Sequence, residues 1–281
     1  MILVTNSNTQ YKEGDVAVDG FNIHYLEWGK SGPEIVLLHG SWPWGMAHNL
    51  DHLSLPLSAK HHVLAPDLPG FGKSDDPTEE MGFKTQVDLL HGAMQNVGFR
   101  DVTLVGISYG GFITMTWSAI YPDDVSSVII LDIPPMRFDE SFPPDPHAQY
   151  IPCPDRFTTK EKVLEYCAKV YHGFTEEYML HQLTYGALDV EGMLKPPSFT
   201  SRRKLMRRDR DLWSDLAAIQ VPTLLVYGAD SHFFNPKIIE EMKKVNHLLS
   251  VLRIEGANHY LPMTHTEETL DAIKDFTLKT R

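Results

Sequence analysis

The chain has 281 residues, enough for one large domain with an insertion, and its 42% hydrophobic and 22% charged residues exclude a disordered or fibrous chain. The formal net charge of −12 repels phosphate backbones and anionic lipid surfaces, so we expect no nucleic acid and no membrane as a partner. The two cysteines, Cys153 and Cys167, are too few for a disulfide framework and lie in no zinc-binding pattern. From the pattern of residues 1–11 and the lack of long apolar runs we expect neither a signal peptide nor a membrane span.

Short runs of valine, isoleucine and leucine alternate along the chain with segments of helical periodicity. This is the pattern of buried parallel strands joined by crossover helices. The predicted strands are residues 21–28 (antiparallel), 35–38, 62–65, 102–105, 128–131, 223–227 and 248–254. The predicted helices are residues 85–97, 109–121, 236–245 and 267–279. Most of the strands end in glycine or aspartate, at the edge of the sheet where α/β proteins carry their functional loops.

One long stretch interrupts this alternation. Residues 133–213 contain no convincing buried strand, and seven prolines lie within residues 134–154, which predicts an irregular arm. Amphipathic segments follow at 160–171 and 176–185. We therefore predict a core domain formed by residues 1–133 and 214–281, and a helical cap inserted at residues 134–213.

The strongest chemical signal is the segment GISYGG at residues 106–111, which lies between a predicted strand and a predicted helix. A serine on such a turn is held in strained backbone torsions, and Gly106 and Gly110 let the chain bend around Ser108. The turn exposes the serine hydroxyl and directs the backbone N–H of Tyr109 toward a developing oxyanion. Ser108 is thus the predicted nucleophile.

A serine hydroxyl needs a general base, and the base needs a carboxylate that holds its tautomer. His259 follows the last predicted strand, behind the flexible Gly256, and is our candidate for the base. Asp230 follows the strand at 223–227 and gives the chain order Ser, Asp, His, so it is the favoured acid. Asp132, at the end of the strand at 128–131, is the alternative.

The loop after the strand at 35–38 should supply a second oxyanion donor. A backbone N–H suffices there, and Gly40 permits a close approach of the chain, so Ser41 is the first choice and Trp42 the second. We interpret His39 in this loop as a buried residue that bonds to backbone rather than as a metal ligand or base. We expect neither a cofactor nor a metal.

Two further segments allow a structural and a functional interpretation. The loop DLPGFGKS at 67–74 lacks the Walker spacing, so we expect a structural turn in which Asp67 bonds to loop amides. The basic run RRKLMRRDR at 202–210 is interpreted as a solvated helix face, and the alternative is a cationic lip that attracts a carboxylate-bearing substrate.

These motifs together resemble the α/β-hydrolase superfamily over residues 20–276. The resemblance rests on HG at 39–40, DLPGFGKSD at 67–75, GISYGG at 106–111 and the loops that carry Asp230 and His259. It implies an α/β fold with a mostly parallel, eight-stranded sheet flanked by helices, and a cap that roofs the pocket. It also implies an acyl-enzyme route: Ser108 attacks a carbonyl, the Ser41 and Tyr109 amides hold the oxyanion, and His259 moves the proton.

Within that superfamily, a serine nucleophile argues against the haloalkane dehalogenase and epoxide hydrolase branches, which use aspartate. We predict a cytoplasmic carboxylesterase, lactonase or related acyl hydrolase, a monomer or homodimer that acts on a small molecule. Trp42, Trp44, Phe233 and Tyr260 are the predicted pocket residues, which suit an apolar or aromatic acyl group.

Three alternatives stay open. The first is a carbon–carbon hydrolase that acts on diketo acids, a branch that usually has an HGxGPG loop and a tryptophan after the catalytic histidine, where this chain has Trp42, Trp44 and Tyr260. The second is a ligand receptor that retains the triad. The third is perhydrolysis by the same triad, which the sequence does not distinguish from hydrolysis.

Overall fold

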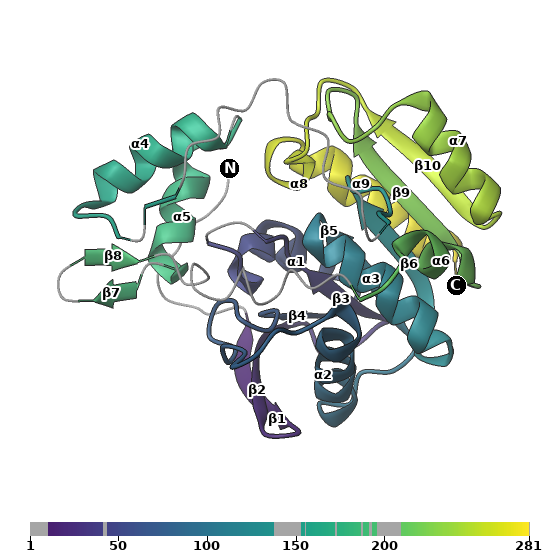
Figure 1. The fold of residues 1–281 in the computed structure, drawn as a ribbon, viewed down its shortest axis with the longest axis horizontal. Helices are drawn as coiled ribbons and strands as arrows, with labels where there is room; N and C mark the ends of the chain where they lie inside the picture. Colours follow the sequence, from purple (N-terminus) through teal and green to yellow (C-terminus); the bar gives the residue numbers. More distant parts are fainter. Residues whose placement is uncertain are drawn as a thin grey trace.

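A twisted eight-stranded sheet forms the centre of the computed structural model, which describes residues 11–41, 44–137, 153–154, 156–171, 173–186, 188–190, 193–195 and 209–280 (Figure 1). The strand order is β1-β2-β4-β3-β5-β6-β9-β10. The strands are β1 (Lys12–Val18), β2 (Phe21–Trp28), β3 (Glu34–Leu38), β4 (His62–Pro66), β5 (Val102–Ile107), β6 (Val125–Leu131), β9 (Thr223–Gly228) and β10 (Leu249–Ile254). The predicted α/β class and the eight-stranded sheet are confirmed.

The sheet is antiparallel at one edge and parallel elsewhere. Strand β2 pairs antiparallel with both β1 and β4, and all the other neighbours pair parallel. All seven predicted strands are present, and each end lies within three residues of its predicted position. Strand β1 was missed because its sequence, KEGDVAV, is largely exposed at the sheet edge and lacks the apolar run that marks the buried strands.

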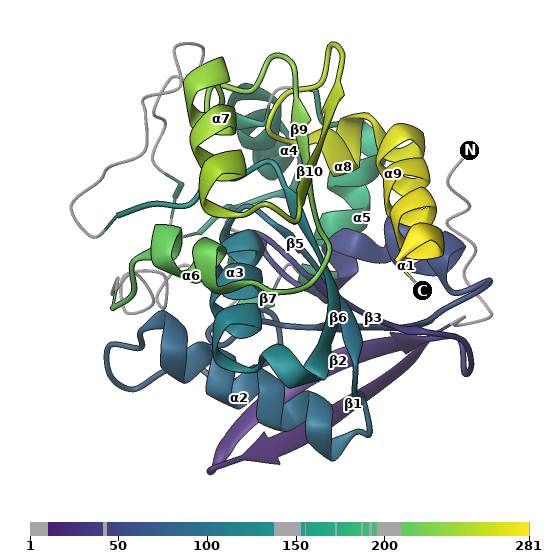
Figure 2. The same ribbon diagram turned by 90° about the vertical axis from the view of Figure 1, so that its right-hand side faces the viewer.

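Helices cover both faces of the sheet. They are η1 (Ala47–Leu50), α1 (Asp51–Leu57), α2 (Phe83–Asn96), α3 (Tyr109–Ile120), η2 (Pro122–Asp124), α4 (Lys160–Val170), α5 (Glu176–Gly186), α6 (Leu212–Ala218), α7 (Pro236–Val245), α8 (Leu261–Thr264) and α9 (Thr266–Lys279). Helices α2, α3, α6 and α7 lie on one face, and α1 and α9 lie on the other (Figure 2). No helix in the described part of the chain is long and apolar enough to cross a membrane.

Two hydrophobic clusters, one on each face, follow from the alternation of side chains along the strands. In β3, Val36 and Leu38 join the cluster that contains the α2 and α3 side chains, whereas Ile35 and Leu37 join the cluster that contains those of α1 and α9. The parallel strands are thus buried on both faces, and their carboxyl ends meet at one edge of the sheet.

Between β6 and β9 the chain leaves the sheet. Helices α4 and α5 and the hairpin of β7 (Leu188–Val190) and β8 (Met193–Lys195) lie together to one side of the sheet (Figure 1). Most of the predicted proline-rich arm lies outside the described residues. The division at residues 133/134 and 213/214 stays a prediction; its second boundary falls inside α6, which is tied to α3 where Thr116 Oγ1 donates to Asp215 Oδ2 at 2.9 Å.

Candidate active site

Ser108 lies at the sharp turn between β5 and α3. Its φ of 53° and ψ of −116° place it in a region that side-chain-bearing residues rarely adopt. The turn is closely packed, because a Cβ on Gly106 would collide with the Gly110 carbonyl oxygen and a Cβ on Gly110 would collide with the Leu38 carbonyl oxygen. The predicted strand, turn and helix around Ser108 are therefore confirmed.

His259 lies beside this serine. It follows β10 and precedes α8, and its Nε2 atom lies 3.1 Å from Ser108 Oγ, within hydrogen-bond distance. The histidine side chain is 15% exposed, so the imidazole is largely shielded but reachable from solvent. The structure thus brings together two side chains that are 151 residues apart in the chain.

The carboxylate next to His259 belongs to Asp132 and not to Asp230, so the contact expected for the favoured residue Asp230 is made instead by the alternative, Asp132. Asp132 Oδ2 lies 2.9 Å from His259 Nδ1, and the Asp132 carbonyl oxygen lies 3.1 Å from the same nitrogen. Asp230 is exposed, and its backbone N–H donates to the Ala257 carbonyl oxygen at 2.9 Å. Asp230 is two residues beyond the end of β9, where the loop has already reached the surface.

The Asp132 carboxylate is fully buried and is held by the neighbouring loop. The Gly228 N–H donates to Oδ1 at 2.8 Å, and the Ser231 hydroxyl donates to Oδ2 at 2.6 Å. A buried carboxylate is costly unless its oxygens are hydrogen-bonded, and these contacts meet that requirement. The contacts of Gly228 and Ser231 with Asp132 were not predicted, although both residues flank Asp230 in the chain.

The predicted oxyanion donors lie on the elements that were expected to carry them. Tyr109 is the first residue of α3, and Ser41 follows β3 by three residues. The tyrosine side chain turns away into the core, where its hydroxyl donates to Gln86 Oε1 at 2.9 Å, so only its backbone is available for the oxyanion. Trp42 lies outside the described residues. The oxyanion roles stay predictions.

His39 bonds to backbone, as expected. Its Nε2 accepts from the Leu68 N–H at 3.0 Å, which leaves the proton on Nδ1 to donate to the Gly40 carbonyl oxygen at 2.9 Å. Burial lowers the pKa of His39 and outweighs the opposing effects of the Asp67 charge and the Gly40 carbonyl. The neutral imidazole therefore links the loop after β3 to the loop after β4 through hydrogen bonds.

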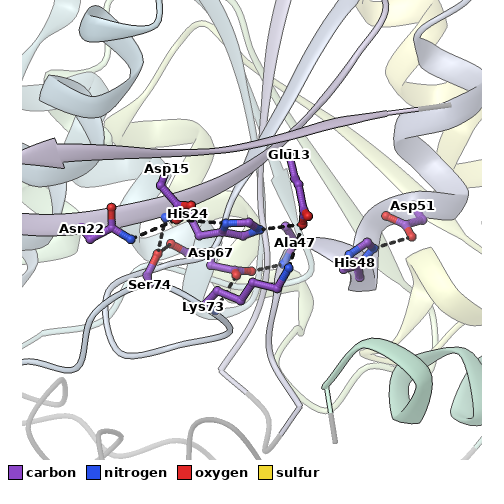
Figure 3. A network of polar contacts seen from close by, with 10 residues as sticks. All are labelled: Glu13, Asp15, Asn22, His24, Ala47, His48, Asp51, Asp67, Lys73 and Ser74. Carbon is purple, nitrogen blue, oxygen red and sulfur yellow. Dashed lines mark hydrogen bonds and ion pairs between the residues drawn. The ribbon is translucent and has the colours of Figure 1, made fainter. Parts of the chain in front are cut away.

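The loop at 67–74 is likewise a structural turn. Asp67 accepts hydrogen bonds from the Ala47 N–H at 2.6 Å and the Lys73 N–H at 2.8 Å, as Figure 3 shows. The prediction that Asp67 bonds to loop amides is confirmed.

Two of the predicted pocket residues flank the imidazole. The ring centroids of Phe233 and Tyr260 lie 4.6 Å and 5.4 Å from that of His259. Tyr260 in turn contacts the rings of Tyr171 and Phe174, at 5.8 Å and 4.9 Å. The surroundings of His259 are therefore aromatic, and they continue into the segment that carries α4 and α5.

Trp44 lies between β3 and η1 in the chain and packs against that segment. Its ring packs against Phe157 at 5.8 Å and Tyr166 at 6.4 Å. It also lines a small apolar cavity, together with Val163, Cys167, Tyr171, Phe174, Met179, Gln182 and Leu183. Burial raises the pKa of Cys167 to about 12, so this thiol is protonated and is not a nucleophile.

Little of the basic run at 202–210 falls within the described residues, which include only its last two positions. Arg210 binds the Asp215 carboxylate through Nε and Nη2, so its charge is already paired. The residues at 202–208, and with them the predicted cationic lip, lie outside the described part of the chain.

Comparisons with known proteins agree with this architecture. The chain is 26% identical over 276 residues to 2-(acetamidomethylene)succinate hydrolase of Mesorhizobium japonicum, covering 93% of this chain and 97% of that one. It is 28% identical over 257 residues to 2-hydroxy-6-oxononadienedioate/2-hydroxy-6-oxononatrienedioate hydrolase of Burkholderia vietnamiensis, covering 83% of each chain.

A solved structure of E-2-(acetamidomethylene)succinate hydrolase superposes on this chain with a TM-score of 0.80 at 24% identity, covering 95% of this chain and 99% of that one. This likeness shows a shared fold. The model of the alpha/beta hydrolase family matches residues 35–272, and the chain belongs to that family.

Proposed function

We propose that the protein is a serine hydrolase that cleaves an ester, lactone or related acyl bond of a small apolar or aromatic molecule. The observation that carries the proposal is the continuous contact from Ser108 Oγ to His259 Nε2 at 3.1 Å and from His259 Nδ1 to Asp132 Oδ2 at 2.9 Å. A nucleophile, a base and an acid in this order are what acyl transfer requires. Membership of the alpha/beta hydrolase family supports hydrolase activity.

Each of these residues has one task in the proposed reaction. His259 Nε2 takes the proton of Ser108 as Oγ bonds to the substrate carbonyl carbon, and Asp132 stabilises the imidazolium that forms. The Tyr109 and Ser41 amides hold the oxyanion. His259 then gives the proton to the leaving group, and it next activates a water that hydrolyses the acyl-enzyme.

The aromatic surroundings support an apolar or aromatic acyl group. Phe233 and Tyr260 flank His259, and Phe233 is 93% buried. Because ligand pockets lined by such rings gain affinity from apolar area, a substrate with a compact apolar acyl group suits them.

A fluorophosphonate probe tests the proposal without knowledge of the substrate. The wild-type protein should be labelled rapidly and with one adduct per chain, and Ser108→Ala should not be labelled. Ser118→Ala is a matched control, because Ser118 is buried in α3 and donates to the Thr114 carbonyl oxygen. A folded wild-type protein that resists the probe would favour a ligand receptor and would overturn the hydrolase proposal.

A series of p-nitrophenyl esters tests the acyl group. Turnover should fall as the acyl chain grows beyond short lengths, because the rings of Phe233 and Tyr260 lie close to His259 on the proposed acyl side. A preference for long chains would contradict this part of the proposal and leave the nucleophile untouched.

Carbon–carbon bond hydrolysis of a diketo acid is the second candidate. Its support is the similarity to the Burkholderia vietnamiensis hydrolase over 83% of this chain. The sequence departs from that branch at Tyr260, where a tryptophan is usual. Cleavage of a carbon–carbon bond in a diketo acid, with little turnover of any ester in the series, would establish this candidate over the first.

A further inference from the structure

Three side chains from separate elements bring potential metal ligands together away from Ser108. His48 lies in η1, Asp51 begins α1 and His181 lies in α5. Asp51 Oδ2 lies 2.9 Å from His48 Nδ1 and 3.1 Å from His181 Nε2, and the three ligand atoms all lie within 4.8 Å of one another. Figure 3 shows His48 and Asp51 directed toward each other, across from the network around His24.

This spacing is close to that of a metal centre. When zinc binds nitrogen and oxygen ligands tetrahedrally at about 2.0–2.1 Å, neighbouring ligand atoms lie about 3.3 Å apart. Two imidazoles and a carboxylate are also a ligand set that transition metals use, with the remaining position open to water. The side chains of His48, Asp51 and His181 are 8%, 19% and 18% exposed, so water and an ion can reach them.

The second carboxylate oxygen of Asp51 is a separate indication of a ligand. Oδ1 is buried, and none of the described residues forms a hydrogen bond with it. A buried acceptor without a partner destabilises the folded state, and more so when it is charged. A cation beside Asp51 removes that cost, because a carboxylate can bind a metal through either oxygen or through both.

The His48 ring is also held in place before any ion arrives. The Tyr185 ring stacks on it at a centroid distance of 3.8 Å, and the Tyr11 ring meets it edge-on at 5.3 Å. An imidazole fixed in this way loses little freedom when it binds a metal.

We propose that His48, Asp51 and His181 form a site for one divalent transition-metal ion, for which Zn²⁺ is the best match. The site joins α5, which lies in the insertion, to the η1–α1 segment of the core. It shares no residue with the Ser108–His259–Asp132 cluster, so it does not depend on the proposed hydrolase activity. The ion holds α5 against the η1–α1 segment by binding side chains from both.

Titration calorimetry of the tag-free, chelator-treated full chain with ZnCl₂ tests the site. We expect one Zn²⁺ per chain. The affinity should fall at least ~100-fold in His181→Gln, because even mutating a residue that only hydrogen-bonds to a metal ligand lowers metal affinity about 10–100-fold. His181→Gln keeps a side chain that can donate to the His48 carbonyl oxygen, which lies 3.1 Å from His181 Nε2. His247→Gln, which removes an exposed histidine between α7 and β10, should bind Zn²⁺ like wild type.

A second measurement needs only the wild-type chain and so tests the site even if a variant folds poorly. Co²⁺ added to the wild-type chain should give the visible d–d bands of a four-coordinate site, and Zn²⁺ should abolish them. Zn²⁺ should also raise the Tm of wild type and of His247→Gln, because a ligand that binds the folded state stabilises it. No stoichiometric binding by wild type, or equal binding by His181→Gln, would leave only a hydrogen-bonded ion pair and overturn the proposal.

Discussion

The loops after β6 and β9 differ sharply although each carries an aspartate close to the end of its strand. Both follow buried strands that are neighbours in the sheet, with Leu131 paired to Val226, and both contain an aspartate close to the strand end. Asp132 comes directly after β6, is 0% exposed and has a φ of 52°, which turns its carboxylate toward His259. Asp230 is exposed. The carboxylate that contacts His259 is the one that is buried and has hydrogen-bond donors around it.

The largest effect should come from exchanging each aspartate for asparagine. Asp132→Asn should reduce the rate of fluorophosphonate labelling by about 10⁴-fold, because the histidine loses the partner that sets its tautomer. Asp230→Asn makes the same chemical change on the surface and should leave the rate within about 2-fold, an effect of the size surface substitutions usually have. Labelling kinetics by mass spectrometry measure both rates.

A larger loss of labelling rate in Asp230→Asn than in Asp132→Asn would place the acid at Asp230 and contradict this prediction. Circular dichroism of both variants should match that of wild type, so that a lost rate is not a lost fold.

Removing each carboxylate should also affect the free energy of unfolding differently in the two loops. Asp132→Ala leaves the Gly228 N–H and the Ser231 hydroxyl without their acceptor, and we expect the free energy of unfolding to fall by about 2–3 kcal/mol. Asp230→Ala should change it by no more than about 0.5 kcal/mol. Urea unfolding followed by fluorescence measures the difference, and equal losses would mean that burial does not distinguish these residues.

Ser231 connects the two loops, because it lies in the loop after β9 and its hydroxyl donates to the buried Asp132 carboxylate. Ser231→Ala removes the 2.6 Å hydrogen bond to Asp132 Oδ2 but leaves the Gly228 contact. A charge-assisted hydrogen bond is worth about 1.5–3 kcal/mol, so labelling should slow by about 10-fold or more. Ser231→Thr, which keeps the hydroxyl, should recover most of the rate; failure of this recovery would assign the loss to packing instead.

The smallest effect concerns pH and the loop after β3. Because burial lowers the pKa of His39 below its ordinary 6.5, the unfolded chain binds a proton that the folded chain resists. The contribution of neutral His39 is therefore fully present above pH 6.5 and is lost as the pH falls through its lower folded-state value. His39→Gln should flatten the decline of unfolding free energy below pH 6.5 by up to about 1.4 kcal/mol per pH unit.

His247→Gln is the control for this measurement, since it makes the same substitution at an exposed histidine. A slope that His39→Gln leaves unchanged would mean that His39 is protonated as readily in the folded protein as in the unfolded one.

Most of the fold could be predicted because burial leaves a clear mark on the sequence. The central strands are buried on both faces, so β3, β5 and β6 read as runs of apolar residues. Strand β1 has one exposed face and a polar sequence, and its pairing depends on β2 rather than on its own residues. Such an element is specified by its tertiary partner, which no local pattern reveals.

The residues of the site also differ in how far the local sequence predicts them. Ser108 and His259 follow from local constraints, a turn that demands glycine on both sides and a loop behind the last strand. The choice between Asp132 and Asp230 depends on distances across the sheet, and periodicity carries no such information. One local signal was present: Asp132 comes directly after an uninterrupted apolar run, whereas Gly228 and Ala229 carry the chain outward before Asp230.

The hydrogen bonds from Gly228 and Ser231 to Asp132 have an evolutionary consequence. They show that the loop after β9 already reaches the space beside His259 Nδ1, although this chain fills that space from β6. A descendant could therefore transfer the acid from one strand to the next by a few substitutions and keep the imidazole where it is. Homologues are better compared at this point by three-dimensional position than by alignment column.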